Sequence, residues 1–600
     1  MQRTTRSIAQ NSRNLGALAS LKAALERNPE QEAAWLAYAN GLVAHGEVAT
    51  ALALMEAAQR RGLRSAATQS LTKNLYNRLQ ANQLHAQATR HHQDRQLHQA
   101  IALYRQALAI QPELVEAEVN LATALQETGA PAQAADHLRR AIAKRPDFAI
   151  AHYNLGNVLA VLGHDPRPAY RDAIALEPAY TDAWYNLALA QEAAGNSQEA
   201  QDCYRGAIAI SPAFAAAHMN LGVLQFAGGQ YEAALVSYEQ ALKADPGLAG
   251  AHSNRGNALR ALGQRDAAAD AYRAAIACDP GLAQAHNHLG NLLRDQGSLE
   301  EAAACFHAAT VADPAFAEPS YNLGYVLMEL GNVAEGFSWL TRHAEQTCRA
   351  QPDSAPEHKR KHDEEQRQHL GTAGPDPLGL LHIAGGGATP GPAVLHHAGV
   401  EEHWHGDHPV VVIDDFLTPQ ALAELRRFCA ASTIWREVYE GGYLGAFPEH
   451  GVACPLLAQI ARELPACYPR IFGNHPLLQL WAFKYGERIT GIPLHADFAA
   501  VNVNFWITPD VANLDQAHGG LVIWDKPAPL DWDFAKYNAD AKASRRFLES
   551  QGAKSLTVPY RANRAVIFDS DLFHETDDIH FSPGYDNRRI NLTLLYGRRG

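Results

Sequence analysis

Residues 232–246 read EAALVSYEQALKADP, an amphipathic run that ends at a proline. Its apolar residues recur every three or four positions, which is the spacing of one face of a helix. Proline cannot continue a helix, because it lacks the backbone N–H and clashes with the preceding turn. The stretch therefore predicts a helix that stops before Pro246.

The same arrangement recurs through the first half of the chain. Each unit consists of a helix carrying A-x-x-N-L-G, a short turn with glycine, and a second helix carrying A-x-x-x-[FY]-x-x-A. The spacings between the closing prolines are 34, 32, 34, 34, 34 and 34 residues, and these prolines are Pro112, Pro146, Pro178, Pro212, Pro246, Pro280 and Pro314. The unit over 146–177 lacks two residues, so we expect its turn or the start of its second helix to be shortened.

This pattern resembles the 34-residue tetratricopeptide repeat. Such units cannot bury their apolar faces alone, so they stack into a superhelix with a long concave groove. A weaker unit near 33–58 extends the pattern towards the N-terminus. We therefore expect degenerate helical repeats over 1–84 and a tetratricopeptide-repeat array over 85–347.

One polar position recurs in the first helix of the units. An amide can both donate and accept hydrogen bonds, so a ladder of amides could hold an extended polypeptide. This part of the chain resembles the repeat array of the O-linked N-acetylglucosamine transferase, in which a comparable asparagine ladder occurs. Alternatively, these side chains satisfy neighbouring helix ends. The candidate peptide-binding residues are Asn120, Asn154, Asn186, Asn220, Asn254 and Asn322.

Composition excludes several classes of protein. The net charge of −13 and the pI near 6.1 argue against a nucleic-acid partner, because such proteins concentrate positive charge. No stretch approaches the roughly 18 apolar residues that a membrane-spanning helix needs. The seven cysteines are scattered and lack any C-x-x-C pair, which indicates reduced thiols. We expect a cytoplasmic protein without a membrane segment.

The periodicity stops after about residue 347. The segment 348–408 contains alternating charge blocks followed by glycine and proline, with few large apolar residues. It is interpreted as a flexible linker. From Pro409 onward the sequence changes character again, into a strand and helix followed by short apolar or alternating runs with Gly, Pro and Asp between them. These runs predict a β-sandwich or jelly roll with flanking helices over 409–600.

A candidate metal site stands on this second fold. Residues 491–506 read GIPLHADFAAVNVNFW, in which His495 and Asp497 would share one face of an extended chain. His574 follows a predicted strand 79 residues after His495. Two histidines and one carboxylate leave coordination positions open on an iron ion, whereas a structural zinc site closes its coordination shell.

A co-substrate anchor is predicted in RRINLTLLY at 588–596. In a strand, Arg589 and Thr593 would face the interior together, and a buried guanidinium is costly unless it meets an anion. The distal carboxylate of a small dicarboxylic acid would be a suitable partner. Asn504, in the stretch 491–506 quoted above, either contacts this co-substrate or packs in the barrel.

Residues 409–600 resemble the iron(II)- and 2-oxoglutarate-dependent dioxygenases, specifically the prolyl-hydroxylase-like branch. The resemblance rests on His495-Ala496-Asp497, His574 and Arg589, and it assigns Tyr485 to 2-oxoglutarate contact. It also implies a double-stranded β-helix, dioxygen as a second substrate and ascorbate as a reductant. The 15 residues from His574 to Arg589 exceed the usual spacing of about ten, so Arg588 is an alternative anchor.

The expected function is hydroxylation of a protein or peptide side chain that the repeat array presents. Hydroxylases of aspartyl, asparaginyl and collagen prolyl residues also pair such helices with an oxygenase domain, which supports this by analogy. Two alternatives stay open. The chain could oxidise a small metabolite and use its repeats for assembly, or it could be a non-catalytic repeat scaffold.

Overall fold

The computed structural model describes residues 16–348, 355–371, 381–405, 409–489 and 491–599. Parts of the predicted N-terminal repeats and of the predicted linker lie outside these residues. The chain forms two compact units, Met1–Pro246 and Gly247–Gly600, which are described separately. In the described residues, every helix is too short or too polar to cross a lipid bilayer.

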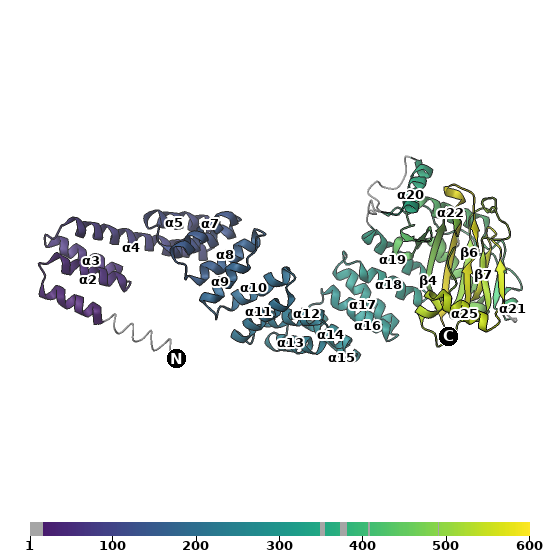
Figure 1. Ribbon diagram of the computed structural model, residues 1–600, viewed down its shortest axis with the longest axis horizontal. Helices are drawn as coiled ribbons and strands as arrows, with labels where there is room; N and C mark the ends of the chain where they lie inside the picture. Colours follow the sequence, from purple (N-terminus) through teal and green to yellow (C-terminus); the bar gives the residue numbers. More distant parts are fainter. Residues whose placement is uncertain (1–15, 349–354, 372–380, 406–408, 490, 600) are drawn as a thin grey trace. The chain divides into compact units, whose positions relative to one another are not determined.

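The first unit is built from antiparallel helix pairs (Figure 1). These helices are α2 (Glu32–Ala44), α3 (Val48–Arg60), α4 (Ala66–Gln93), α5 (Leu97–Ile110), α6 (Val115–Glu127), α7 (Pro131–Lys144), α8 (Ala149–Val161), α9 (Arg167–Leu176), α10 (Thr181–Ala193), α11 (Ser197–Ile210), α12 (Ala215–Ala227) and α13 (Tyr231–Ala244).

The recurring glycine of each unit lets its two helices approach closely. A Cβ atom on Gly222 of α12 would lie 2.6 Å from the ring of Tyr238 on α13, and the same relation holds between Gly156 and Tyr170. The [FY] position therefore fills the space that the glycine leaves. The two-residue deletion shortens the second helix of its unit, because α9 has 10 residues where α11 and α13 have 14. The predicted helix pairs and the predicted shortening in the unit over 146–177 are confirmed.

The second unit begins with six more repeat helices: α14 (Ala249–Ala261), α15 (Arg265–Cys278), α16 (Ala283–Asp295), α17 (Leu299–Ala312), α18 (Glu318–Glu329) and α19 (Val333–Thr347). The last pair shares a hydrophobic core with the β region that follows. Met328, Phe337 and Leu340 are buried in the same cluster as the sheet residues. Tyr325 of α18 also donates a hydrogen bond to Glu449, at 3.0 Å.

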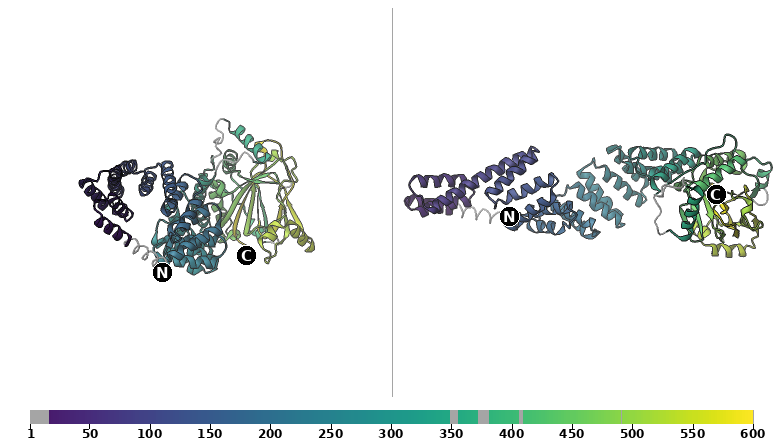
Figure 2. Two further views of the ribbon diagram at one scale, coloured as in Figure 1. Left: turned by 60° about the vertical axis from the view of Figure 1, so that its left-hand side comes forward. Right: turned by 90° about the horizontal axis from the view of Figure 1, so that it is seen from above.

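Twelve described strands make up the β region, and Figure 2 shows them, coloured green to yellow, gathered in one body. They are β1 (Val410–Ile413), β2 (Glu437–Tyr439), β3 (Tyr443–Ala446), β4 (Leu477–Tyr485), β5 (Arg488–Ile489), β6 (Ala499–Trp506), β7 (Leu521–Pro527), β8 (Ser555–Val558), β9 (Ala565–Asp569), β10 (Leu572–Thr576), β11 (Ile579–His580) and β12 (Ile590–Arg598). The flanking helices are α21 (Val400–Trp404), α22 (Pro419–Ala431), α23 (Pro455–Cys467), α24 (Pro469–Phe472) and α25 (Ala541–Ser550).

The strands form antiparallel sheets. One has seven strands in the order β1-β9-β6-β12-β4-β3-β2, another has three in the order β10-β7-β8, and β11 pairs with β5. A bridge between His495 and His574 continues the second sheet. Each apolar run that indicated a strand is a strand, and Thr418 caps α22 by accepting a hydrogen bond from the backbone N–H of Ala421. An all-α repeat array followed by a β region is therefore confirmed.

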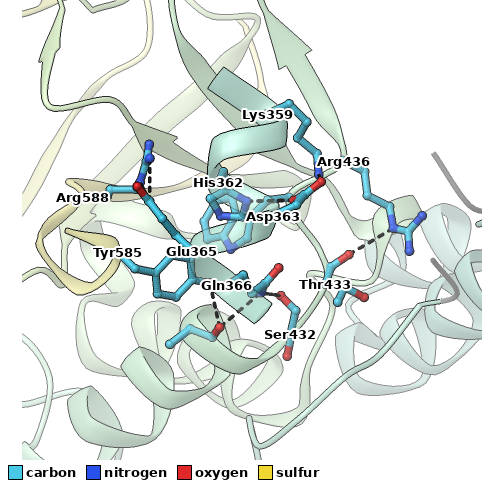
Figure 3. Close-up of polar contacts among 12 residues, drawn as sticks. Lys359, His362, Asp363, Glu365, Gln366, Ser432, Thr433, Arg436, Tyr585 and Arg588 are labelled. Atoms are coloured by element: carbon cyan, nitrogen blue, oxygen red, sulfur yellow. Dashed lines mark hydrogen bonds and ion pairs between the residues drawn. The ribbon is translucent and has the colours of Figure 1, made fainter. Parts of the chain in front are cut away.

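Helix α20 (Glu357–Leu370) lies within the segment interpreted as a linker and packs on the β region through polar side chains (Figure 3). Gln366 donates to the backbone carbonyl of Ser432 at 3.0 Å, and Glu365 pairs with Arg588 at 2.7 Å. His362 is fully buried, with its ring 5.4 Å from that of Tyr585. The helix is held by hydrogen bonds and an ion pair rather than by an apolar face.

Candidate metal centre

Three side chains predicted to bind a metal converge in the β region. His495 and Asp497 lie in the segment before β6, and His574 lies on β10. The backbones of the two histidines pair, with N···O distances of 2.9 and 2.7 Å. Asp497 places one carboxylate oxygen 3.9 Å from His495 Nε2 and the other 3.4 Å from His574 Nε2. In the described part of the chain, this is the one group of three His, Cys, Asp or Glu residues whose ligand atoms lie within 4.8 Å of one another.

Backbone carbonyls fix the orientation of both imidazoles. His495 Nδ1 lies 2.8 Å from the carbonyl oxygen of Pro493, and His574 Nδ1 lies 3.0 Å from that of Leu572. A carbonyl only accepts, so each Nδ1 carries the proton. Each Nε2 then has a free lone pair directed at Asp497, which is the arrangement of metal-binding histidines.

The charges in the group suit a cation. Burial, together with the neighbouring His574, lowers the pKa of His495 to about 4. Burial alone would raise the pKa of Asp497, but the two adjoining imidazoles and Asn502, which donates to Oδ2, outweigh it and lower that pKa. At neutral pH the site thus offers one neutral imidazole from His495 and one buried carboxylate from Asp497, a negative charge that a bound cation would compensate.

A chain of amides supports the carboxylate ligand. Asn502 donates to Asp497 Oδ2 at 2.6 Å, and Asn504 donates to Asn502 at 2.6 Å. Asn591 and Thr593 both donate to Asn504 Oδ1, at 2.9 Å each. All four side chains are buried. Asn502 was not among the predicted site residues. It lies two residues before Asn504 on β6 and so shares its face of the strand, and this alternation is the signal that could have found it.

A cavity of about 450 Å³ opens over the three ligands. Tyr485, Asn504 and Thr593, each predicted to contact a co-substrate, line its wall beside the ligands. Part of its wall is aromatic: the rings of Tyr439 and Tyr443 stack 4.6 Å apart, and Tyr443 lies 5.4 Å from the ring of Tyr485. This aromatic wall was not predicted, because its members come from β2, β3 and β4, whose pairing the sequence does not reveal.

Arg589 is fully buried behind Tyr485. Its Nε donates to the carbonyl of Gly519 at 2.7 Å, and its guanidinium carbon lies 4.7 Å from the centre of the Tyr485 ring. Its Nη1 has no hydrogen-bond partner among the described residues. The neighbouring Arg588 instead pairs with Glu365 of α20. A buried guanidinium with a free donor can receive an anion.

The candidate peptide-binding asparagines lie in the repeats, away from the metal ligands in the sequence, and several bond to the preceding repeat. Asn120 contacts His85 Nε2 at 2.9 Å, and Asn186 donates to Tyr153 at 3.2 Å. The remaining members and their surroundings are Asn220, which donates to Tyr185; Asn322, buried and bonded to Asn287 and Arg294; and Asn154 and Asn254, both half-buried.

Comparison with known families identifies the repeats. Models described as TPR repeat and tetratricopeptide repeat match residues 91–158, 169–202, 225–263, 256–293 and 290–331. A search of curated proteins gives no match.

Several solved structures are similar to part of the chain. MamA is 25% identical over 26% of this chain and 94% of its own, with a TM-score of 0.26. YrrB, described as a TPR protein with an unusual peptide-binding site, is 21% identical over 30% of this chain and 95% of its own, with a TM-score of 0.28. Part of a TPR repeat-containing protein from Cytophaga hutchinsonii is 16% identical over 40% and 98%, with a TM-score of 0.35. The matched residues of the chain are thus tetratricopeptide repeats, and the C-terminal β region carries a His-x-Asp and a distant His that could together hold a metal ion.

Proposed function

We propose that the β region is an iron(II)- and 2-oxoglutarate-dependent dioxygenase that hydroxylates a side chain of a protein or peptide. The observation that carries the proposal is the ligand group. The Nε2 atoms of His495 and His574 and the carboxylate of Asp497 meet at one point beneath a cavity. Three protein ligands leave positions for a co-substrate and dioxygen, which suits non-haem iron(II) oxygenases.

The pairing of strands supports a jelly roll, or double-stranded β-helix. Counted along the chain, eight segments wind as a folded hairpin: β4, the segment with His495, β6, β7, β8, β9, β10 and β12. The first pairs with the eighth, the second with the seventh, the third with the sixth and the fourth with the fifth. That order distributes the strands over two sheets facing each other, as in jelly rolls.

The buried end of the cavity supports 2-oxoglutarate as the co-substrate. Arg589 lies behind the lining residue Tyr485, and its free Nη1 would bind the distal carboxylate. Tyr485 would donate a hydroxyl hydrogen bond nearby, and Thr593 would do so if its hydroxyl turns away from Asn504. Tyr485 N bonds to the carbonyl of Arg589 at 2.9 Å, which fixes the two side chains together. Arg588 is the weaker candidate because Glu365 already neutralises it.

When bound, iron(II) and 2-oxoglutarate would use dioxygen to decarboxylate the keto acid to succinate and carbon dioxide and to insert the second oxygen atom into a substrate C–H bond. The chain's own residues hold this reaction in place. His495, Asp497 and His574 fix the ion, and Asn502 holds the carboxylate of Asp497 in one orientation. The aromatic wall excludes water from the cavity.

A protein or peptide substrate is the function that the fused repeats favour. Capture of a polypeptide by repeats in the same chain would raise its effective concentration at the iron. Asn120, Asn154, Asn186, Asn220 and Asn254 stay our candidates for that capture, whereas the amide of Asn322 is buried and bonded to Asn287 and Arg294.

Succinate formation tests the proposal. Full-length protein with iron(II), ascorbate, 2-oxoglutarate and cell extract should form succinate, and D497A and H574A should abolish it. The control is H403A, which removes an exposed histidine of the same unit. Absence of succinate, or equal turnover by H574A and H403A, would rule out the oxygenase. Protein targets are then sought by a mass gain of one oxygen atom, and their absence alongside succinate would favour a small metabolite.

A further inference from the structure

A second cavity of about 480 Å³ adjoins the metal centre. It lies between repeat helices α16 and α18 on one side and β4 with the end of β12 on the other. Gln479 of β4 and Phe498 line both this cavity and the one over the metal ligands. Phe498 directly follows the ligand Asp497. The two cavities are therefore neighbours beside the metal centre, with Gln479 and Phe498 at their boundary, and the last repeats form one wall of the second cavity.

The register of the strands shows which end of the site faces this approach. Gln479 lies across from Leu595, which pairs in turn with Asn502, the residue that bonds Asp497. Tyr485, at the far end of β4, lies six residues away, which is about 20 Å along a strand. The proposed co-substrate anchor thus sits at the closed end, whereas the metal ligands sit at the end that opens towards the repeats.

The second cavity is an open groove, and its lining is positively charged although the chain has a net charge of −13. Arg294 of α16 and Arg598 and Arg599 of the C-terminal end line it, against one acidic residue, Glu329. Arg598 pairs with Glu329 at 3.3 Å, yet its side chain is 77% exposed. Arg599 pairs with Asp571 outside the lining, and Arg294 bonds to the amide of Asn322 rather than to a carboxylate. An acidic partner would therefore complement Arg294 and the exposed Arg598.

The groove also offers contacts to a peptide backbone and to side chains. The amide of half-buried Gln479 makes no side-chain hydrogen bond within the described residues, so it is free to bond a peptide group at the junction of the two cavities. Tyr321 presents a ring 4.8 Å from that of Tyr325 on the same wall. These features suit an extended chain better than a compact metabolite.

We propose that this groove, formed by Arg294, Tyr321, Tyr325, Gln479 and Arg598, binds an extended acidic peptide segment and leads the residue to be hydroxylated to the metal centre. The inference rests on the proposed function for its chemistry, but the groove itself is tested by binding alone. The acidic side chain lies within a few residues of the target residue, because the cavities share Gln479 and Phe498.

Fluorescence anisotropy with the full-length protein tests the groove. The probes are labelled peptides of about ten residues, which extend to about 33 Å, made of glycine and alanine with glutamate, serine or lysine. We expect the glutamate peptide to bind most tightly and to weaken with salt. R598E should lower its affinity by up to about five-fold, as expected for one charge contact at an exposed site, and should raise the affinity of the lysine peptide.

The matched control is R470E, which reverses an arginine that is 55% exposed, pairs with Glu402 and lies outside the groove. Equal binding of the three peptides, or equal effects of R598E and R470E, would overturn the proposal. Because binding needs neither iron nor 2-oxoglutarate, the two proposals fail separately. Selective peptide binding without succinate formation would contradict the proposed oxygenase activity. Succinate formation with unselective peptide binding would contradict the proposed peptide groove.

Discussion

The amide network makes a quantitative prediction for metal affinity. Asn502 is fully buried and donates to the carboxylate of Asp497 at 2.6 Å. A hydrogen bond to a charged group is worth about 1.5–3 kcal/mol, and every 1.4 kcal/mol is a factor of ten in affinity. N502A should therefore weaken metal binding about 10- to 100-fold, in line with the effect of losing a residue that orients a metal ligand.

The assay is a calorimetric titration of the metal-free protein with Mn²⁺, or with Fe²⁺ in the absence of oxygen. The control is N591A, which alters the same network but bonds to Asn504 rather than to the ligand. We expect its affinity to fall less than three-fold, because the bond between Asn502 and Asp497 stays. Unchanged affinity in N502A, or an equal loss in N591A, would refute the idea that this amide orients the carboxylate.

Three further predictions concern packing, the co-substrate and pH. G222A should destabilise its unit by about 1–3 kcal/mol in urea unfolding, because the new methyl group overlaps the ring of Tyr238. R589A should abolish 2-oxoglutarate binding measured by calorimetry, whereas R588A should leave it intact and increase hydrogen exchange in α20. Burial would raise the pKa of Glu118, but hydrogen bonds and charges from His137 and Lys144 outweigh it and lower that pKa. The ionised carboxylate therefore stabilises the folded protein fully above the ordinary glutamate pKa near 4.5, and this stabilisation is lost as the pH falls through the lowered pKa of the folded state. E118Q should thus cost stability at pH 7 and progressively less below pH 4.5 in thermal unfolding.

Periodic features of the fold could be predicted because each depends on local chemistry. The proline period marks the helix pairs, and the shortened α9 follows directly from the missing residues in its unit. In the β region, alternation along β12 placed Asn591 and Thr593 on one face, and both line the cavity while Leu592 and Leu594 lie in the core. A period of 2 in the sequence is sufficient for such assignments.

Contacts between distant segments could not be predicted in the same way. His495 and His574 were paired as candidates by residue type and order, but only the pairing of their backbones brings them together. Helix α20 was not predicted, because EHKRKHDEEQRQHL has no apolar stripe. It packs through Gln366 and Glu365, whose partners lie 66 and 223 residues away.

The end of the asparagine series shows how one residue type serves two roles. Asn322 is buried, donates to Asn287 at 3.0 Å and accepts from Arg294 at 3.2 Å, so both its donor and its acceptor are used within the chain. Its bond to Arg294 holds that guanidinium on the wall of the positively charged groove. At the last repeat the amide therefore supports an arginine in place of offering itself to a peptide. In the proposed groove, selection of a peptide would then depend on charge, which Arg294 and the exposed Arg598 supply.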